Sequence, residues 1–260
     1  MALRSLLHHI DTNNLDLRQL DISNTASIRS HSCGNTHKGW VRFVNEDAFL
    51  ELSDARLWAV ADGMGGHKRG DYASNAVIKA LRRFSRKPKL LSSIEDLQNL
   101  LVEANEVCQK AFRARRIGST AALLFEFGGH CFFIWAGDSR IYRIRDGHLE
   151  QMTRDHSLAQ EKFAKGELNQ DEAQRHSSAH ILTKAIGINR HLKLELRCSA
   201  VKPGDRYLLC SDGLYGEAQA ADLKLHLSQQ SQTEALDGLI NVALERGGRD
   251  NITGIIVDFE

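Results

Sequence analysis

Carboxylates stand at the ends of the most apolar segments of this 260-residue chain. Asp62 and Asp212 each follow an apolar run, Asp250 comes just before the last such run, and Glu46-Asp47 precedes a shorter one. A carboxylate beside a buried segment loses part of its hydration, which is unfavourable unless something compensates. Carboxylate and carbonyl oxygens suit hard cations such as Mg²⁺ and Mn²⁺. These residues are therefore candidate ligands of divalent cations.

A glycine follows both Asp62 and Asp212, where it allows the backbone to turn sharply and to approach a ligand closely. An isolated Asp-Gly pair is more typical of a plain turn. Two such pairs after apolar runs, together with Asp250-Asn251 before another, weaken that interpretation. The pattern by itself fits a set of plain turns and a metal cluster equally well.

The apolar runs that carry these acids are predicted β-strands. Gly128-Gly129 separates two of them as a hairpin turn, and Asp146-Gly147 turns the chain back between two others. The predicted strands cover residues 57–61, 120–127, 131–136, 141–145, 148–151, 207–210 and 252–259.

Helices are predicted where apolar residues repeat at spacings of three and four. This periodicity covers residues 73–84, 97–111 and 236–244, and Gly247-Gly248 ends the last of these segments. Because the helices do not alternate strictly with the strands, a doubly wound parallel sheet is not favoured. Antiparallel sheets with helices packed outside them fit better, which predicts an α+β fold.

The composition is that of one folded globular domain. Apolar residues make up 42% and charged residues 26% of the chain, and no Gly/Ser-rich linker divides it. We interpret the polar residues 1–25 as an N-terminal extension, either frayed or forming a short first helix. The formal net charge of +1 argues against nucleic acid or an anionic membrane as a partner. No segment approaches the roughly 18 apolar residues of a membrane span.

The five cysteines show no CxxC spacing, and Cys108 and Cys210 lie within apolar runs. We interpret them as reduced, hydrophobic side chains, which predicts a cytoplasmic protein. The chain has no GxxxxGK[ST] loop, and the glycines around Gly63 and Gly65 lack the GxGxxG spacing. A nucleotide-binding enzyme is therefore disfavoured.

Eight short motifs occur in one order along the chain, and together they resemble the metal-dependent protein phosphatase family, also called protein phosphatase 2C. The resemblance covers residues 27–259, and the Asp-Gly-Met-Gly-Gly motif is similar to that of the short bacterial members. The motifs are Arg42-Phe-Val-Asn-Glu46-Asp47, Val60-Ala-Asp62-Gly63-Met-Gly-Gly-His67, Gly118-Ser119-Thr120, Ala136-Gly-Asp138-Ser-Arg140, Thr153-Arg-Asp-His156-Ser157, Leu182-Thr-Lys-Ala-Ile-Gly187, Cys210-Ser-Asp212-Gly213 and Arg249-Asp250-Asn251.

The resemblance implies a central sandwich of two antiparallel β-sheets flanked by α-helices, with a metal-containing cleft at one end. Residues 26–260 would form the catalytic domain. Residues 157–181 resemble the mobile flap that family members carry beside the cleft, and a plain pair of surface helices is compatible with the same sequence.

The resemblance also assigns the metal ligands, for two tightly bound Mn²⁺ or Mg²⁺ ions. Asp62 would bridge both ions, and the Gly63 carbonyl would bind one of them. Asp212 and Asp250 would bind the other. Glu46 would support the first ion, directly or through water.

Further residues are assigned around this centre. Asp47 is placed with the metal-site residues and, like Asn251, would orient metal-bound water. Asp138 matches the aspartate that helps to hold a weaker third ion in bacterial relatives. Arg42 would grip two phosphoryl oxygens with its planar guanidinium, although an arginine outside this motif would be interpreted as a surface residue.

The implied reaction is hydrolysis of phosphoserine and phosphothreonine on proteins by water activated between two metal ions. No phosphoenzyme is needed, and no cysteine stands in the CxxxxxR loop of a cysteine phosphatase. Met64 occupies a position where some relatives have a histidine that acts as general acid, and a thioether cannot donate a proton. Metal-bound water and His67 are then the candidate donors, and we favour water, with His67 in a structural role.

His156 resembles a family position, but His156-Ser157 also suits a helix cap, which we favour. The expected substrates are phosphorylated proteins, namely a cognate Ser/Thr kinase and its targets, and the chain is expected to act as a monomer. The alternative is a catalytically weak family member that binds phosphoproteins as a regulator. Loss of a ligand would mark that class, and Asp62, Asp212 and Asp250 are all present.

Overall fold

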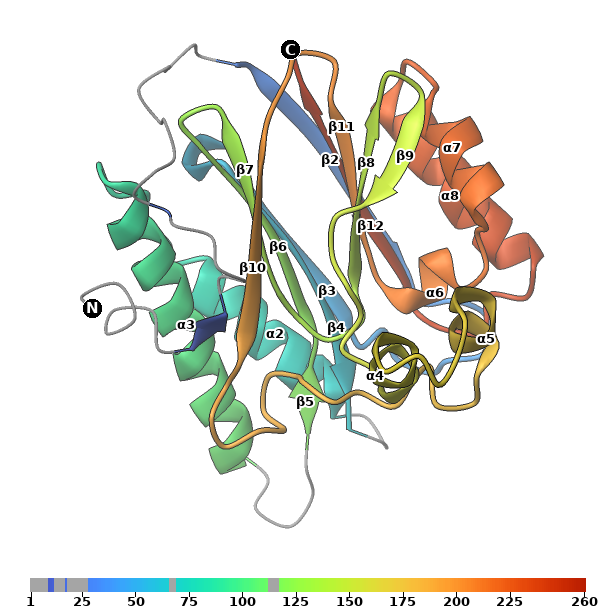
Figure 1. Cartoon of the computed structure of the whole chain (residues 1–260), viewed down its shortest axis with the longest axis horizontal. Helices are drawn as coiled ribbons and strands as arrows, with labels where there is room; N and C mark the ends of the chain where they lie inside the picture. Colours follow the sequence, from blue (N-terminus) through green and yellow to red (C-terminus); the bar gives the residue numbers. More distant parts are fainter. Residues whose placement is uncertain (1–8, 12–16, 18–27, 66–68, 112–116) are drawn as a thin grey trace.

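In the computed structural model two β-sheets pack face to face, and helices cover the outer face of each sheet (Figure 1). The structure describes residues 9–11, 17, 28–65, 69–111 and 117–260. This arrangement confirms the predicted α+β sandwich. None of the helices within these residues combines the length and the apolar character needed to cross a lipid bilayer.

The first sheet pairs neighbouring strands antiparallel, except that β1 runs parallel to β10. Its order is β1 (Ile10–Asp11), β10 (Leu194–Ala200), β7 (His130–Ala136), β6 (Ala121–Phe127), β4 (Leu57–Met64) and β3 (Asp47–Leu52), and β5 (Gly118–Ser119) pairs with β4. Part of the segment expected as an N-terminal extension therefore joins this sheet through β1, and Ile10 and Leu17 are buried in its core. Most other residues of that segment lie outside those described.

The second sheet is antiparallel throughout, in the order β2 (Ser30–His37), β12 (Ile252–Phe259), β11 (Arg206–Cys210), β8 (Arg140–Arg145) and β9 (His148–Gln151). The predicted hairpin turns are confirmed, because Gly128, Gly129, Asp146 and Gly147 all have positive φ angles. Strand β2 was not predicted, since its sequence is polar. It forms because it pairs with β12 along its full length.

Helices lie on both outer faces of the sandwich. The 12-residue α2 (Gly70–Leu81) and the 22-residue α3 (Leu90–Ala111) pack on the first sheet, and α7 (Ala220–Leu227) and α8 (Gln232–Glu245) pack on the second (Figure 1). The three periodic segments are thus confirmed as α2, α3 and α8, and α7 was not predicted. Shorter helices are η1 (Ser53–Ala55), α4 (Leu158–Ala164), α5 (Gln170–Arg175) and α6 (Asp212–Tyr215).

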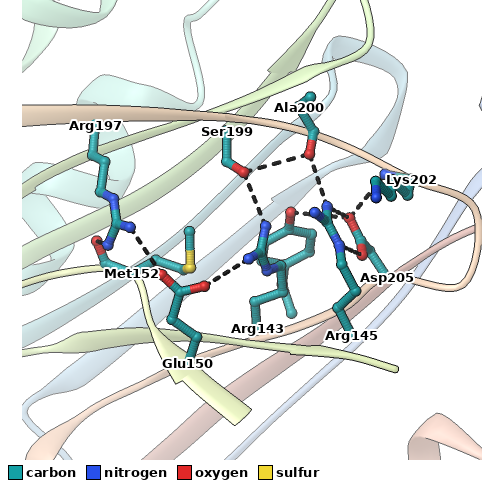
Figure 2. Close-up of polar contacts among 10 residues, drawn as sticks. Arg143, Arg145, Glu150, Met152, Arg197, Ser199, Ala200, Lys202 and Asp205 are labelled. Atoms are coloured by element: carbon teal, nitrogen blue, oxygen red, sulfur yellow. Dashed lines mark hydrogen bonds and ion pairs between the residues drawn. The ribbon is translucent and has the colours of Figure 1, made fainter. Parts of the chain in front are cut away.

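The two sheets are joined by an apolar layer and by a polar network at one edge. In the apolar layer, the rings of Tyr207 and Trp58 each make an edge-to-face contact with the ring of Phe259, at centroid distances of 5.7 and 6.0 Å. At the edge, Glu150 of β9 accepts hydrogen bonds from Arg143 of β8 at 2.6 Å and from Arg197 of β10 at 2.8 Å (Figure 2). The bond between Arg197 and Glu150 ties the first sheet to the second.

Candidate active site

Nearly all predicted site residues line one open cavity of about 540 Å³. Asp47 lies behind its wall, and His67 lies outside the described residues, so its predicted role is not placed. The lining residues are Arg42, Glu46, Asp62, Gly63, Met64, Gly65, Thr120, Asp138, His180, Leu182, Asp212, Asp250 and Asn251. The fold therefore brings together acids that are up to about 200 positions apart in the sequence.

Asp47 and Asp62 lie directly opposite each other on the neighbouring strands β3 and β4. Like charges in such a cross-strand pair repel each other. Burial raises the pKa of Asp47 to about 7, and burial followed by repulsion from Asp47 and Asp212 raises that of Asp62 well above its ordinary value. Asp47 Oδ2 accepts a hydrogen bond from Ser211 at 2.7 Å, whereas buried Oδ1 has no partner among the described residues. Such a group of repelling carboxylates fits divalent cations.

The glycines after the two key aspartates are required by close backbone contacts. A Cβ on Gly63 would lie 2.1 Å from the Gly70 carbonyl oxygen, and one on Gly213 would lie 2.1 Å from that of Asn251. The Glu46 carboxylate accepts the Gly70 N–H at 2.9 Å, at the start of α2. These glycines therefore bring protein backbone together beside the carboxylates, a packing role that the Asp-Gly pattern did not reveal.

The Gly-Ser-Thr motif holds the end of β4. The Thr120 hydroxyl accepts the Asp62 N–H at 2.9 Å and lies 2.6 Å from the Ser139 hydroxyl. The Thr120 N–H donates to the Asp62 carbonyl at 2.8 Å. Asp62 is thus fixed at its backbone, which leaves its carboxylate to face the cavity.

Asn251 braces the segment that carries Arg42. Its side-chain amide donates to the carbonyls of Lys38 at 2.8 Å and Val44 at 3.0 Å, and its oxygen accepts the Glu46 N–H at 2.8 Å. Both amide donors are used in this way. The structure therefore shows Asn251 fixing residues 38–46, and its part in orienting metal-bound water stays a prediction.

Arg42 and Asp250 form a two-pronged ion pair, with Nε to Oδ1 at 2.8 Å and Nη2 to Oδ2 at 2.6 Å. These hydrogen bonds raise the pKa of the guanidinium, which keeps it protonated. Sequence reasoning placed both residues at the site, but it did not predict that they pair. The pair neutralises one carboxylate of a cluster that otherwise repels itself.

Asp138 and Asp212 meet a histidine that sequence reasoning missed. One ligand atom from each of Asp138, His180 and Asp212 lies within 4.8 Å of the others, which could hold a metal ion. Burial and the nearby Asp212 charge raise the pKa of Asp138 to about 8, and the Tyr215 hydroxyl donates to the Asp138 carbonyl at 3.0 Å. His180 stands two residues before the Leu182 motif, and no local pattern marks it.

Comparison with known proteins decides the family. The sequence profile of the family described as protein phosphatase 2C matches residues 36–252. This chain belongs to the protein phosphatase 2C family.

Two bacterial serine/threonine phosphatases are similar to this chain over most of its length. The serine/threonine phosphatase Stp of Listeria welshimeri is 30% identical over 240 residues, which are 88% of this chain and 95% of the relative. PstP of Mycobacterium tuberculosis is 32% identical over 225 residues, which are 85% of this chain and 43% of that protein.

Solved structures agree with this membership. PppA, described as a key regulatory component of the T6SS in Pseudomonas aeruginosa, has 38% identity and a TM-score of 0.80, covering 89% of this chain and 98% of PppA. The PstP catalytic domain in complex with two manganese ions has 30% identity and a TM-score of 0.79, covering 90% and 99% of the two chains. The chain is therefore a metal-dependent serine/threonine protein phosphatase with the phosphatase 2C fold.

The cap predicted at His156-Ser157 is confirmed, with Ser157 as the capping residue, whereas the buried His156 makes different contacts. Ser157 caps α4 by accepting the Gln160 N–H at 3.3 Å. The His156 ring accepts the Gly137 N–H at Nδ1, at 3.1 Å, so Nε2 carries the proton and donates to Glu195 at 2.8 Å. Glu195 is buried and also accepts from Lys184 at 2.7 Å. The group supports the turn that precedes Asp138.

Glu195→Ala is expected to lower the free energy of unfolding by about 3 kcal/mol, because it leaves His156 and Lys184 without their buried partner. Although burial opposes it, hydrogen bonding to His156 and Lys184 lowers the Glu195 pKa from 4.5 to about 2. Because the folded-state pKa is depressed, this stabilisation is present above pH 4.5 and is lost as the pH falls toward 2.

Urea denaturation of the Glu195 variant at neutral and acidic pH measures both effects. Glu103→Ala is the matched control, since Glu103 pairs with Arg83 on the exposed surface and is expected to contribute little. Equal losses in the two variants would contradict the role assigned to the buried group.

Proposed function

We propose that the carboxylate cluster holds two Mn²⁺ or Mg²⁺ ions for hydrolysis of phosphoserine and phosphothreonine. Asp62, the Gly63 carbonyl, Asp212, Asp250 and Glu46 would hold the ions, with Asp47 close behind them. The observation that carries this proposal is the meeting of these acids in one cavity, with the pKa of Asp62 raised by burial and by its neighbours. When bound, such ions lower the pKa of water and offset the charge of a phosphoryl group.

Arg42 would bind the phosphoryl group of the substrate. A guanidinium has five N–H donors, of which two hold Asp250, so donors remain for phosphoryl oxygens. The bond to Asp250 places this positive charge at the edge of the metal ligands, and Asn251 fixes the backbone on both sides of it. Arg42 therefore approaches the substrate in a fixed position relative to the carboxylates.

The proton for the leaving group has to come from a source other than Met64. Met64 lines the cavity, and its thioether has no proton to donate. We propose that His67 serves a structural role, as the sequence favoured. The serine or threonine oxygen would then take its proton from water in the cavity.

The substrates would be phosphorylated proteins, namely a cognate Ser/Thr kinase and its targets. We propose that residues 26–260 form the catalytic domain and that the segment 157–181, which contains α4 and α5, serves as its flap. Support for the flap comes from its end, where His180 and the next residue after the flap, Leu182, line the cavity. A reducing cytoplasm would keep the five free cysteines as thiols, and the chain would act there as a monomer.

Hydrolysis of p-nitrophenyl phosphate and of a phosphoserine peptide tests the proposal. Both are expected to require millimolar Mn²⁺ or Mg²⁺ and to stop when a chelator is added. Binding of the phosphopeptide without turnover would favour a phosphoprotein-binding regulator instead. Comparing the phosphoproteins of cells with and without the active enzyme would then identify the substrates.

Arg42→Ala is expected to raise KM by roughly ten- to a hundredfold with a smaller fall in kcat, because charged hydrogen bonds to phosphate are lost in the ground and transition states alike. Steady-state kinetics at saturating Mn²⁺ measures the two constants. Arg83→Ala removes an exposed arginine that pairs with Glu103 and is the control. A fall confined to kcat would show that Arg42 acts only in the transition state.

A further inference from the structure

Large apolar side chains are exposed on the segment that carries Arg42. The exposed fractions are 66% for Trp40, 61% for Val41 and 91% for Phe43. Scattered single apolar residues on a surface are ordinary, but three within four consecutive positions form a patch. We call Val41 and Phe43 the apolar rim, since they flank Arg42, which lines the cavity.

The backbone of this segment is held firmly in place. The Trp40 N–H donates to the Gly248 carbonyl at 2.7 Å, and its indole donates to the Leu244 carbonyl at the end of α8 at 3.2 Å. A Cβ on Gly39 would lie only 2.2 Å from the Asp250 carbonyl oxygen. Because the segment is anchored on the turn before β12, the backbone that carries the apolar rim is held in place, which lowers the entropic cost of binding a partner.

A second segment of the cavity lining repeats the arrangement. His180 and Leu182 line the cavity, and Ile181 between them is 54% exposed. The Ile181 carbonyl accepts the Leu158 N–H at 2.9 Å, which attaches it to the start of α4. In both segments, therefore, exposed apolar side chains stand next to residues that line the cavity.

We propose that the apolar rim and Ile181 bind bulky apolar side chains next to the phosphoserine or phosphothreonine of a protein substrate. The inference rests on the proposed function, because a phosphoryl group held by Arg42 places its neighbouring residues against these surfaces. The chemistry that fits is a phosphorylated segment with residues such as Leu or Phe beside the phosphorylated position.

A double variant, Val41→Ser with Phe43→Ser, tests the surface without touching the carboxylates. The substrates are two phosphoserine peptides that differ only in having Leu and Phe, or Ser and Gly, beside the phosphoserine. For the variant, kcat/KM is expected to fall about tenfold or more on the apolar peptide, as the loss of buried side chains implies. It is expected to stay unchanged on the polar peptide and on p-nitrophenyl phosphate.

Leu225→Ser is the matched control, because Leu225 is 66% exposed on α7, outside the cavity lining. It is expected to leave all three substrates unaffected. If the wild type hydrolyses both peptides and the double variant matches it on the apolar one, the surface proposal is overturned and the proposed function stands. If the wild type with Mn²⁺ hydrolyses none of the substrates, both fail together.

Sedimentation of the wild type and the double variant separates substrate binding from self-association. A monomer at all concentrations, combined with the selective kinetic loss, supports the surface as a substrate site. A concentration-dependent dimer that the double variant abolishes, with unchanged peptide kinetics, would instead assign the surface to a second copy of the chain.

Discussion

Asp212→Asn is expected to abolish turnover while leaving the fold intact. The Asp212 side chain is 21% exposed and faces the cavity, with Oδ2 at 3.5 Å from His180 Nδ1. Asparagine keeps the shape of the side chain but removes one negative charge from a site built for cations. Turnover should fall by more than about 100-fold, since even the outer partners of metal ligands typically contribute 10- to 100-fold.

Three measurements check this result. Turnover of p-nitrophenyl phosphate with Mn²⁺ should vanish, calorimetric titration should show a weakened Mn²⁺ site, and the melting temperature without metal should be no lower than that of the wild type. Asp222→Asn is the control, because Asp222, on α7, pairs with Arg246 and lies outside the cavity lining. Unchanged turnover in the Asp212 variant would refute the assignment of two metal ions to these acids.

Asp138→Ala is expected to lose activity but to keep tight binding of two ions. Asp138 meets Asp212 and His180, whereas Glu46, Asp62 and Asp250 are the other carboxylates that line the cavity. Its backbone stays in place, because Tyr215 holds its carbonyl and His156 holds the preceding Gly137 N–H. The loss in kcat should reach roughly tenfold or more, as the outer partners of metal sites typically do.

Calorimetric titration with Mn²⁺ distinguishes the two kinds of site. The Asp138 variant should retain the tight sites, while the concentration of Mn²⁺ that gives half-maximal activity rises. His180→Ala should raise that concentration as well, since His180 offers a ligand atom to the same group. Loss of the tight sites in the Asp138 variant would overturn a separate third site.

The sequence by itself predicted the α+β fold class and the candidate acids, and the family resemblance supplied the roles predicted for those acids. Apolar runs with turn residues between them predicted β4, β6, β7, β8, β9, β11 and β12, because each strand has to bury at least one face. Spacings of three and four predicted α2, α3 and α8 for the same reason. Asp62, Asp212 and Asp250 were found because they break apolar patterns at strand ends, where an unpaired charge is costly.

Tertiary structure alone decided which of these groups touch. The contact of Arg42 with Asp250, the brace of Asn251 on Lys38 and Val44, and the bond of His156 to Glu195 each join distant parts of the chain. Strand β2 is a similar case, since its polar sequence becomes a strand only by pairing with β12. Local patterns record what each segment buries, whereas these contacts depend on how the two sheets and their helices pack, which no local spacing encodes.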